Sequence, residues 1–181
     1  MILKTERLQL RPWSETDAES LYEYAKDPLV GPIAGWPVHS SVEHSRQIIR
    51  DVLSSDTTFA VVLNESGKAV GSIGLMLGKQ SNLIIGDKEA ELGYWIGVPY
   101  WGRGLIPEAA RAMMHYAFEE LELSTLWCGY FDGNEKSKRV QEKCGFQYHH
   151  TEANKEWPLM NDHRTEHITC IKKAQWQSTY R

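Results

Sequence analysis

The chain has 181 residues, of which 41% are hydrophobic and 24% are charged, and its formal net charge is -4. This composition excludes a disordered chain and is typical of a globular protein that buries a core. The acidic balance argues against general nucleic-acid binding, because phosphate contacts need a basic surface. We expect one domain over residues 1–181, present as a monomer or homodimer.

The cysteines and the N-terminal segment indicate the cellular compartment in which we expect the protein. Cys128, Cys144 and Cys170 have no CxxC spacing, and three cysteines cannot all pair, which favours thiols in a reducing cytoplasm. The first residues include Lys4 and Glu6 and lack the apolar stretch of a secretory leader, so we expect none. Because no apolar run approaches the ~20 residues that span a bilayer, we expect no membrane contact.

The first third of the chain predicts a strand and two helices. Residues 7–13 alternate polar and apolar side chains, as in a half-buried strand. Ser14 and Asp17 have the spacing of a capping box and predict a helix start. Residues 31–40 are rich in Gly and Pro and predict a loop, whereas 42–53 have helical periodicity.

The middle of the chain predicts three strands and a long helix. The strand candidates are residues 57–64, 68–77 and 89–98. A short Glu-Ser-Gly connection predicts that the first two form an antiparallel hairpin. Residues 105–121 then carry a broad apolar stripe at helical spacing.

The last third predicts strands around a short helix. That helix starts at Asn134 and is stopped by Gly145. Residues 174–181 are expected to form a loosely held tail. The strand candidates are 125–131, 146–153 and 164–173. The order gives an α+β fold with a mixed sheet, in which the strand-helix-strand unit over 89–131 is parallel.

A glycine-rich turn, YWGRGLIPE, joins the strand and the helix of this parallel unit. Helix N-termini carry partial positive charge and free N–H donors, so a turn with Gly102, Arg103 and Gly104 is typical of a phosphate site. The P-loop pattern is absent, and Pro107 occupies the third glycine position of a dinucleotide fingerprint. A purely structural turn remains the alternative.

Three blocks, TERLQLRPW, AELGYWIGVPYWGRGLIPEA and NEKSKRVQEKCGF, occur in order along the chain. Together they resemble the GNAT N-acetyltransferases of the ribosomal-protein (RimJ/RimL-like) group over nearly the full length. The first position of the family's [RQ]-x-x-G-x-[GA] turn falls on Pro99, which departs from the pattern. The resemblance implies a GNAT-like acyl-CoA N-acyltransferase fold of about seven mostly antiparallel strands, a splayed parallel pair and four helices.

The resemblance also implies acetyl-CoA as co-substrate and a set of residues that bind it. The strand backbone that would bind the pantetheine arm is at Trp95, Ile96 and Val98. The N–H groups for the pyrophosphate belong to Gly102, Arg103, Gly104, Leu105 and Ile106. Asn134, Ser137, Lys138 and Arg139 complete the coenzyme contacts. The alternative interpretation is structural: Asn134 is only an N-cap, and Lys138 and Arg139 only form a solvated helix face.

The chemistry expected at the thioester is direct attack by a neutral amine. Glu91 is the candidate base, acting through water, although an ion-paired strand carboxylate is an equal alternative. Many relatives have a Tyr seven residues after the Asn, where this chain has Gln141. Ser137 is therefore the candidate acid, with a purely binding role as the alternative.

The acceptor is expected to be a protein N-terminal α-amine or a small amine, which needs only a weak base. Trp36 and Trp157, on loops, are the candidate acceptor contacts. The histidines lack the spacing of a metal site, so we expect no metal. Two other functions stay open, namely a non-catalytic acyl-CoA-binding regulator and a small-molecule acetyltransferase acting on an antibiotic or a polyamine.

Overall fold

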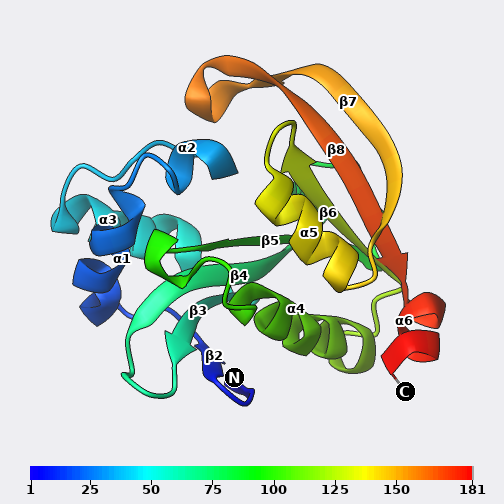
Figure 1. The fold of residues 1–181 in the computed structure, drawn as a ribbon, viewed down its shortest axis with the longest axis horizontal. Helices are drawn as coiled ribbons and strands as arrows, with labels where there is room; N and C mark the ends of the chain where they lie inside the picture. The colour runs from blue at the N-terminus through cyan, green and yellow to red at the C-terminus, as the bar shows by residue number, and fades with distance from the viewer. Residues whose placement is uncertain (181) are drawn as a thin grey trace. The chain divides into compact units, whose positions relative to one another are not determined.

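A computed structural model describes residues 1–180 of the chain (Figure 1). Their contacts divide the chain into two compact units. The first comprises Met1–Gly74 and Tyr94–Ala109, and the second comprises Leu75–Gly93 and Ala110–Arg181. Strands β4 (Ala69–Leu77) and β5 (Glu89–Ile96) contribute residues to both units.

The strands form a mixed sheet of eight, with the hydrogen-bonded order β1-β2-β3-β4-β5-β6-β8-β7. Strands β1 to β4 pair antiparallel from β1 to β2, from β2 to β3 and from β3 to β4. Strands β5 and β6 pair parallel, whereas β8 pairs antiparallel with both β6 and β7. The expected α+β class and the single parallel unit are therefore confirmed.

The first unit contains the N-terminal strands and three helices. Its elements are β1 (Leu3–Lys4), β2 (Leu8–Arg11), a 3₁₀ turn (Glu15–Asp17), α1 (Ala18–Ala25), α2 (Gly31–Ala34), α3 (Val42–Ile48), a π-helical turn (Ile49–Leu53) and β3 (Thr58–Leu63). Ser14 and Asp17 form the expected capping box, and the Ser41 side chain caps α3. These caps satisfy N–H groups that a helix start leaves open. A short 3₁₀ turn (Val98–Tyr100) precedes α4 (Leu105–His115).

The second unit contains the carboxyl-terminal half of the sheet. A π-helical turn (Tyr116–Glu120) ends the long helix, and β6 (Thr125–Phe131) and α5 (Glu135–Lys143) follow. Strands β7 (Gln147–Trp157) and β8 (Asp162–Lys172) form a long curved hairpin in Figure 1. Short 3₁₀ turns lie at Gly78–Gln80 and Pro158–Met160.

Each unit has its own buried apolar side chains. In the first, Leu21, Ala25 and Ile49 from the helices form a cluster with Ala60 and Val62 of β3. In the second, Met113, Met114 and Phe118 are fully buried, as are Leu126 and Ile171. The 3.6-residue stripe seen in the sequence after the glycine turn is thus a buried helix face.

The structure differs from the sequence prediction in three elements. The predicted loop 31–40 contains α2, a single helical turn with Pro32 in its first turn. The predicted loose tail instead forms α6 (Lys173–Tyr180), because Trp176 is buried against Phe118; Arg181 lies outside the described residues. With the two-residue β1 added, the described chain has eight strands and six α-helices rather than seven and four.

Residues 1–180 contain neither a membrane-spanning helix nor a cluster of metal ligands. No helix there is long and apolar enough to cross a bilayer. Nor does any group of three His, Cys, Asp or Glu side chains in that stretch have an arrangement that could hold a metal ion. None of the three cysteines is in a disulfide, and Cys128 and Cys144 are buried.

Candidate active site

The parallel pair of strands is short compared with the strands themselves. Within the second unit, β5 and β6 pair at Glu89 with Thr125, Ala90 with Leu126 and Glu91 with Trp127. Strand β6 continues to Phe131, beyond the last of these pairs. A strand edge beyond the last paired residue presents backbone N–H and C=O groups to which an extended ligand can add.

The glycine turn lies in the first unit, between β5 and α4. Gly102 and Gly104 both have φ of 74°, a left-handed conformation that other L residues adopt at a cost. A Cβ added at Gly102 would meet no atom within 4 Å, so the backbone there faces open space. Helix α4 starts next, at Leu105, and the N–H groups of its first turn have no partner inside the helix. Phosphate binding at this turn stays a prediction.

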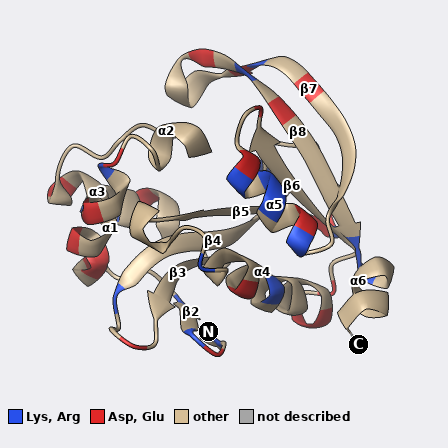
Figure 2. Ribbon diagram, in the orientation of Figure 1, with Lys and Arg blue, Asp and Glu red and all other residues tan. Residues whose placement is uncertain are grey.

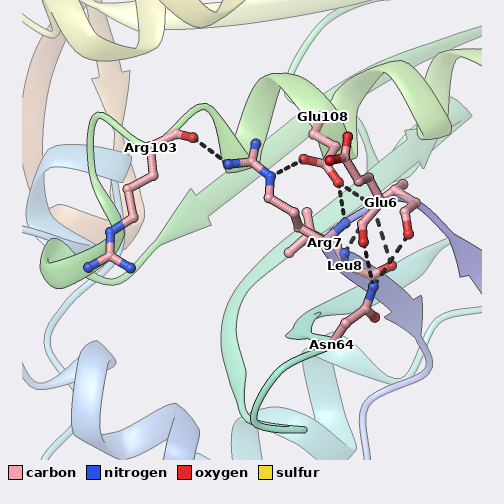
Figure 3. A network of polar contacts seen from close by, with 7 residues as sticks. Glu6, Arg7, Leu8, Asn64, Arg103 and Glu108 are labelled. Atoms are coloured by element: carbon pink, nitrogen blue, oxygen red, sulfur yellow. Dashed lines mark hydrogen bonds and ion pairs between the residues drawn. The ribbon is translucent and has the colours of Figure 1, made fainter.

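The turn is connected to the N-terminal segment by a polar network (Figure 3). The Glu108 carboxylate, in the first part of α4, accepts a hydrogen bond from the Thr5 hydroxyl at 2.6 Å and forms an ion pair with Arg7 Nε at 2.7 Å. Arg7 Nη1 also donates to the Arg103 carbonyl at 2.9 Å. Burial raises the pKa of Glu108, but the hydrogen bonds from Thr5 and Arg7 outweigh this and hold it below its ordinary value.

The strand end before the turn is folded back on itself. The carbonyl of Ile96 accepts a hydrogen bond from the indole Nε1–H of Trp101 at 2.9 Å, and Val98 accepts from the Trp101 amide at 3.1 Å. Trp95 packs edge-to-face against Trp36, with ring centroids 5.6 Å apart. The backbone expected to bind pantetheine therefore lies next to an aromatic cluster in the same unit.

Helix α5 of the second unit begins at its expected cap. Asn134 Oδ1 accepts a hydrogen bond from the Ser137 amide at 3.2 Å, which is an N-cap contact. Ser137 Oγ accepts from Gln141 Nε2 at 3.2 Å, and Gln141 is only 2% exposed. The same Gln141 amide group donates to the Gly129 carbonyl and accepts from the Thr169 hydroxyl. Gln141 thus connects α5 to the sheet.

The two basic candidates on α5 lie on its charged surface. Figure 2 shows residues of both signs along this helix. Lys138 Nζ is 3.9 Å from the Glu135 carboxylate, and Arg139 is exposed. Both residues remain predictions as coenzyme contacts.

Glu91 is a buried carboxylate on β5, 5% exposed. Its Oε2 atom accepts hydrogen bonds from the Ser81 hydroxyl at 2.7 Å and from the Asn82 amide at 2.8 Å. These two donors belong to the segment that follows β4 and fix the carboxylate in one orientation. The role of Glu91 as a base stays a prediction.

A second buried carboxylate, Glu166 on β8, lies in the same unit and is 4% exposed. A Cβ on Gly129 would lie 2.2 Å from Glu166 Oε1, so the carboxylate lies directly over the β6 backbone. Lys155 Nζ contacts Glu166 at 3.0 Å, Glu152 at 2.7 Å and the Asn82 carbonyl at 3.2 Å. Burial raises the pKa of Glu166, Lys155 partly offsets this, and the Glu91 charge adds to the rise.

The two tryptophans expected at the acceptor site belong to different units. In the first, Trp36 packs against Gly31, Trp95 and His39. In the second, Trp157 ends β7 and packs edge-to-face on Phe131, with ring centroids 4.9 Å apart. Both residues are partly exposed.

Sequence reasoning missed four charged residues in these networks: Arg7, Glu108, Lys155 and Glu166. Arg7 and Glu108 stand within the blocks that carry the family resemblance, so their signal was present but local patterns do not pair residues a hundred positions apart. Glu166 is a charged residue at an inward position of a predicted strand, which is rare without a partner. This unusual position is the sequence signal by which Glu166 could have been found.

Comparison with known proteins gives the family. Residues 7–147 match the model of the Acetyltransferase (GNAT) domain, and this chain belongs to that family of acetyltransferase enzymes. It is 29% identical over 150 residues to "Uncharacterized N-acetyltransferase p20" of Bacillus licheniformis, covering 80% of this chain and 82% of that protein. A GNAT-family acetyltransferase structure from Bacillus anthracis is 25% identical with a TM-score of 0.80, covering 96% of this chain and 99% of the other.

A further relative matches over a shorter stretch. "Putative ribosomal N-acetyltransferase YdaF" of Bacillus subtilis is 46% identical over 65 residues, which is 36% of each chain. This relative agrees with the resemblance to the ribosomal-protein group that the sequence blocks show.

Proposed function

We propose that this chain transfers the acetyl group of acetyl-CoA to a primary amine, and that the acceptor is a protein N-terminal α-amine or a small amine. GNAT acetyltransferases use acetyl-CoA as co-substrate. The observation that carries the proposal is the glycine turn at the start of α4, with two left-handed glycines and an open backbone face.

The residues of the turn fit a diphosphate. Because Gly102 has no side chain and its Cβ position faces open space, a phosphate oxygen could approach the main chain there. The N–H groups of Gly102 to Ile106 and the positive end of the α4 dipole supply donors and charge without a metal ion. Ser137 and the Asn134 cap would contact the rest of the coenzyme, as the family resemblance implies.

The amine must lose a proton when it attacks the thioester carbonyl. In the proposed reaction the C–N bond forms, the C–S bond breaks and the amine proton passes through a water molecule to Glu91 Oε1. Ser81 and Asn82 hold Glu91 Oε2, which leaves Oε1 for this proton. The thiolate of coenzyme A, whose thiol has a pKa of about 8.5, is a tolerable leaving group, and a hydroxyl such as Ser137 would donate a proton to it and regain one from solvent.

Two arguments favour an α-amine acceptor: the cost of deprotonating the amine, and the name of one similar protein. An α-amine with pKa about 7.7 to 8 is already partly neutral at pH 7. A lysine amine has a pKa of about 10.4, which is about 2.5 pKa units higher. Its deprotonation at neutral pH therefore costs roughly 3.4 kcal/mol more. Glu91 is a carboxylate acting through water, so it is a weak base. The name of the YdaF relative, which refers to ribosomal N-acetylation, also supports a protein N-terminus.

The experiment is a turnover assay with matched acceptors. Purified chain and acetyl-CoA are incubated with a peptide that has a free α-amine, the same peptide with that amine blocked, a polyamine and an aminoglycoside. Coenzyme A thiol release and product mass are measured. We expect acetylation of the free peptide but not of the blocked one.

Other outcomes identify the alternatives. Turnover only with the polyamine or the aminoglycoside would show a small-molecule acetyltransferase. Tight acetyl-CoA binding without turnover on any amine would favour a non-catalytic acyl-CoA-binding regulator. If calorimetry with coenzyme A gave no heat, the proposed function would be wrong.

A further inference from the structure

The peptide unit between Arg103 and Gly104 is held by a side chain from the other end of the sequence. Arg7 Nη1 donates to the Arg103 carbonyl oxygen at 2.9 Å. No peptide bond among the described residues is cis. In a planar trans peptide the C=O and N–H bonds point in opposite directions. A donor that fixes the Arg103 carbonyl therefore also fixes the direction of the Gly104 N–H.

Arg7 is itself fixed by α4. Glu108 Oε2 accepts from Arg7 Nε at 2.7 Å, and Glu108 Oε1 accepts from the Arg7 backbone amide at 2.8 Å and from the Thr5 hydroxyl at 2.6 Å. The guanidinium thus connects the Glu108 carboxylate to the Arg103 carbonyl with two of its nitrogens. Lysine has one nitrogen on a flexible stem and cannot reproduce this fork.

The contact uses the main chain of Arg103 and not its side chain. Figure 3 shows the Arg103 guanidinium pointing away from the Arg7 network. It lies instead 5.4 Å from the ring centroid of Tyr100. A Cβ on Gly104 would lie 3.7 Å from Arg7 Nη2, so the guanidinium also packs beside the turn. Arg7 therefore contacts the same turn through a hydrogen bond and through packing.

We propose that Arg7 is a positioning residue for the diphosphate-binding turn: it orients and polarises the Arg103–Gly104 peptide so that the Gly104 N–H donates to a diphosphate. A charged donor on a carbonyl strengthens the N–H donor at the other end of the same peptide. Glu108 keeps Arg7 in place through the ion pair with Nε. This inference rests on the proposed function, because it needs coenzyme A at the turn.

The test is calorimetry of coenzyme A and of dephospho-coenzyme A with four proteins. They are the unchanged chain, Arg7→Gln, Arg7→Lys and the control Arg50→Gln. Arg50 is also a partly exposed arginine of the first unit, paired with Glu15 at 2.9 Å, but it is not in the turn network. Thermal unfolding of each protein is recorded alongside. If the unchanged chain binds neither ligand, the proposed function itself has failed.

We expect Arg7→Gln and Arg7→Lys to lower the affinity for both ligands about tenfold. This is the typical effect of losing one hydrogen bond to a charged group. Arg50→Gln should bind like the unchanged chain. Equal loss for the two ligands is expected because the 3′-phosphate, which only coenzyme A has, is not the group that the turn binds. Three outcomes would overturn the inference. These are full affinity in Arg7→Gln whatever its melting temperature, full affinity in Arg7→Lys, and a loss confined to coenzyme A.

Discussion

Each unit contains a polar network, and the two networks differ in how far their charged groups are exposed to water. The Arg7–Glu108 network of the first unit is partly solvated, with 46% of the Arg7 side chain exposed. The Lys155–Glu166 network of the second unit lies in a buried environment, with 5% of the Glu166 side chain exposed. In the Arg7–Glu108 network, water screens the charges, and the charged side chains orient main-chain groups by hydrogen bonds. In the second, an unpaired charge would be costly, so each member depends on its partners.

This contrast suggests different consequences of mutation. Changes near the glycine turn should alter ligand affinity with modest loss of stability, because its polar groups can rehydrate. Changes among the buried carboxylates should alter either catalysis or stability strongly.

The largest expected effect is in Glu91→Gln. Glutamine can still accept from Ser81 and Asn82 through its amide oxygen but cannot take a proton. We expect kcat to fall about 100-fold at neutral pH, the lower range for loss of a general base, with unchanged coenzyme A affinity. Steady-state kinetics and calorimetry measure both quantities.

The matched control is Glu89→Gln. Glu89 lies on the same strand, and its Oε2 likewise accepts two hydrogen bonds, from Trp127 and from Gly86. It should keep full activity. A Glu91→Gln enzyme with normal kcat would show that Glu91 is not the base.

Gly104→Val tests the glycine turn. Valine is strained at φ of 74° and its branched side chain would disturb the Gly104 peptide, so we expect coenzyme A affinity to fall about 30-fold. Gly67→Val is the control, because Gly67 has φ of 68° in the hairpin between β3 and β4. Both variants should lose similar stability in urea unfolding, but only Gly104→Val should lose affinity. Equal affinities in the two variants would argue against ligand binding at the turn.

Lys155→Met tests the buried network. It leaves Glu166 without its ammonium partner, so we expect about 2 kcal/mol less stability at pH 7, below the usual cost because Lys155 is partly exposed. The pKa of Glu166 is already raised in the folded state and should rise further, so the variant should regain stability as pH falls from 7 towards 5.

Two further variants check this result by urea unfolding. Adding Glu166→Gln to Lys155→Met should restore part of the loss at pH 7, since no buried charge then lacks a partner. Lys68→Met removes the exposed ion pair with Glu23 and should cost no more than about 1 kcal/mol. A Lys155→Met protein as stable as Lys68→Met would mean that Glu166 is well solvated.

The smallest effect concerns His39 of the first unit. Burial, with a smaller contribution from His44, lowers the pKa of His39 to about 4, and its Nδ1 lies 2.8 Å from Ser45 Oγ. Between the ordinary pKa of about 6.5 and 4, the unfolded chain binds this proton and the folded chain does not. Stability contributed by neutral His39 is therefore present above pH 6.5 and is lost as pH falls.

We expect this loss to reach about 1 kcal/mol between pH 6.5 and 5, and His39→Asn should reduce it. Urea unfolding at the two pH values gives the comparison, with His163→Asn as an exposed histidine control. An unchanged pH dependence in His39→Asn would assign the loss to other groups.

Much of the fold could be predicted from local patterns. The capping box at Ser14, the Glu-Ser-Gly hairpin and the strand 125–131 all correspond to observed elements, because each depends on neighbours in sequence. The glycine turn was recognisable for the same reason. The tail was predicted wrongly over the described residues, since α6 has little amphipathic pattern and depends on the burial of Trp176.

The networks of the candidate site were less accessible to sequence reasoning. Arg7 and Glu108 are separated by 101 positions, and Lys155 and Glu166 meet only because β7 and β8 pair with a bulge between Glu152 and Lys155. The role of Gln141, which bonds both Ser137 and the sheet, also needs the three-dimensional structure. Such pairings depend on register and strand order, which a linear pattern does not determine.

The burial of the cysteines has a practical consequence for enzymology. Burial raises the pKa of Cys144 to about 11 and also raises that of Cys170, so little thiolate exists on either near neutral pH. Disulfide reagents react with thiolates, and these protein sulfurs should therefore respond slowly. Release of coenzyme A could then be followed continuously with a coloured disulfide reagent, with little background from Cys144 and Cys170.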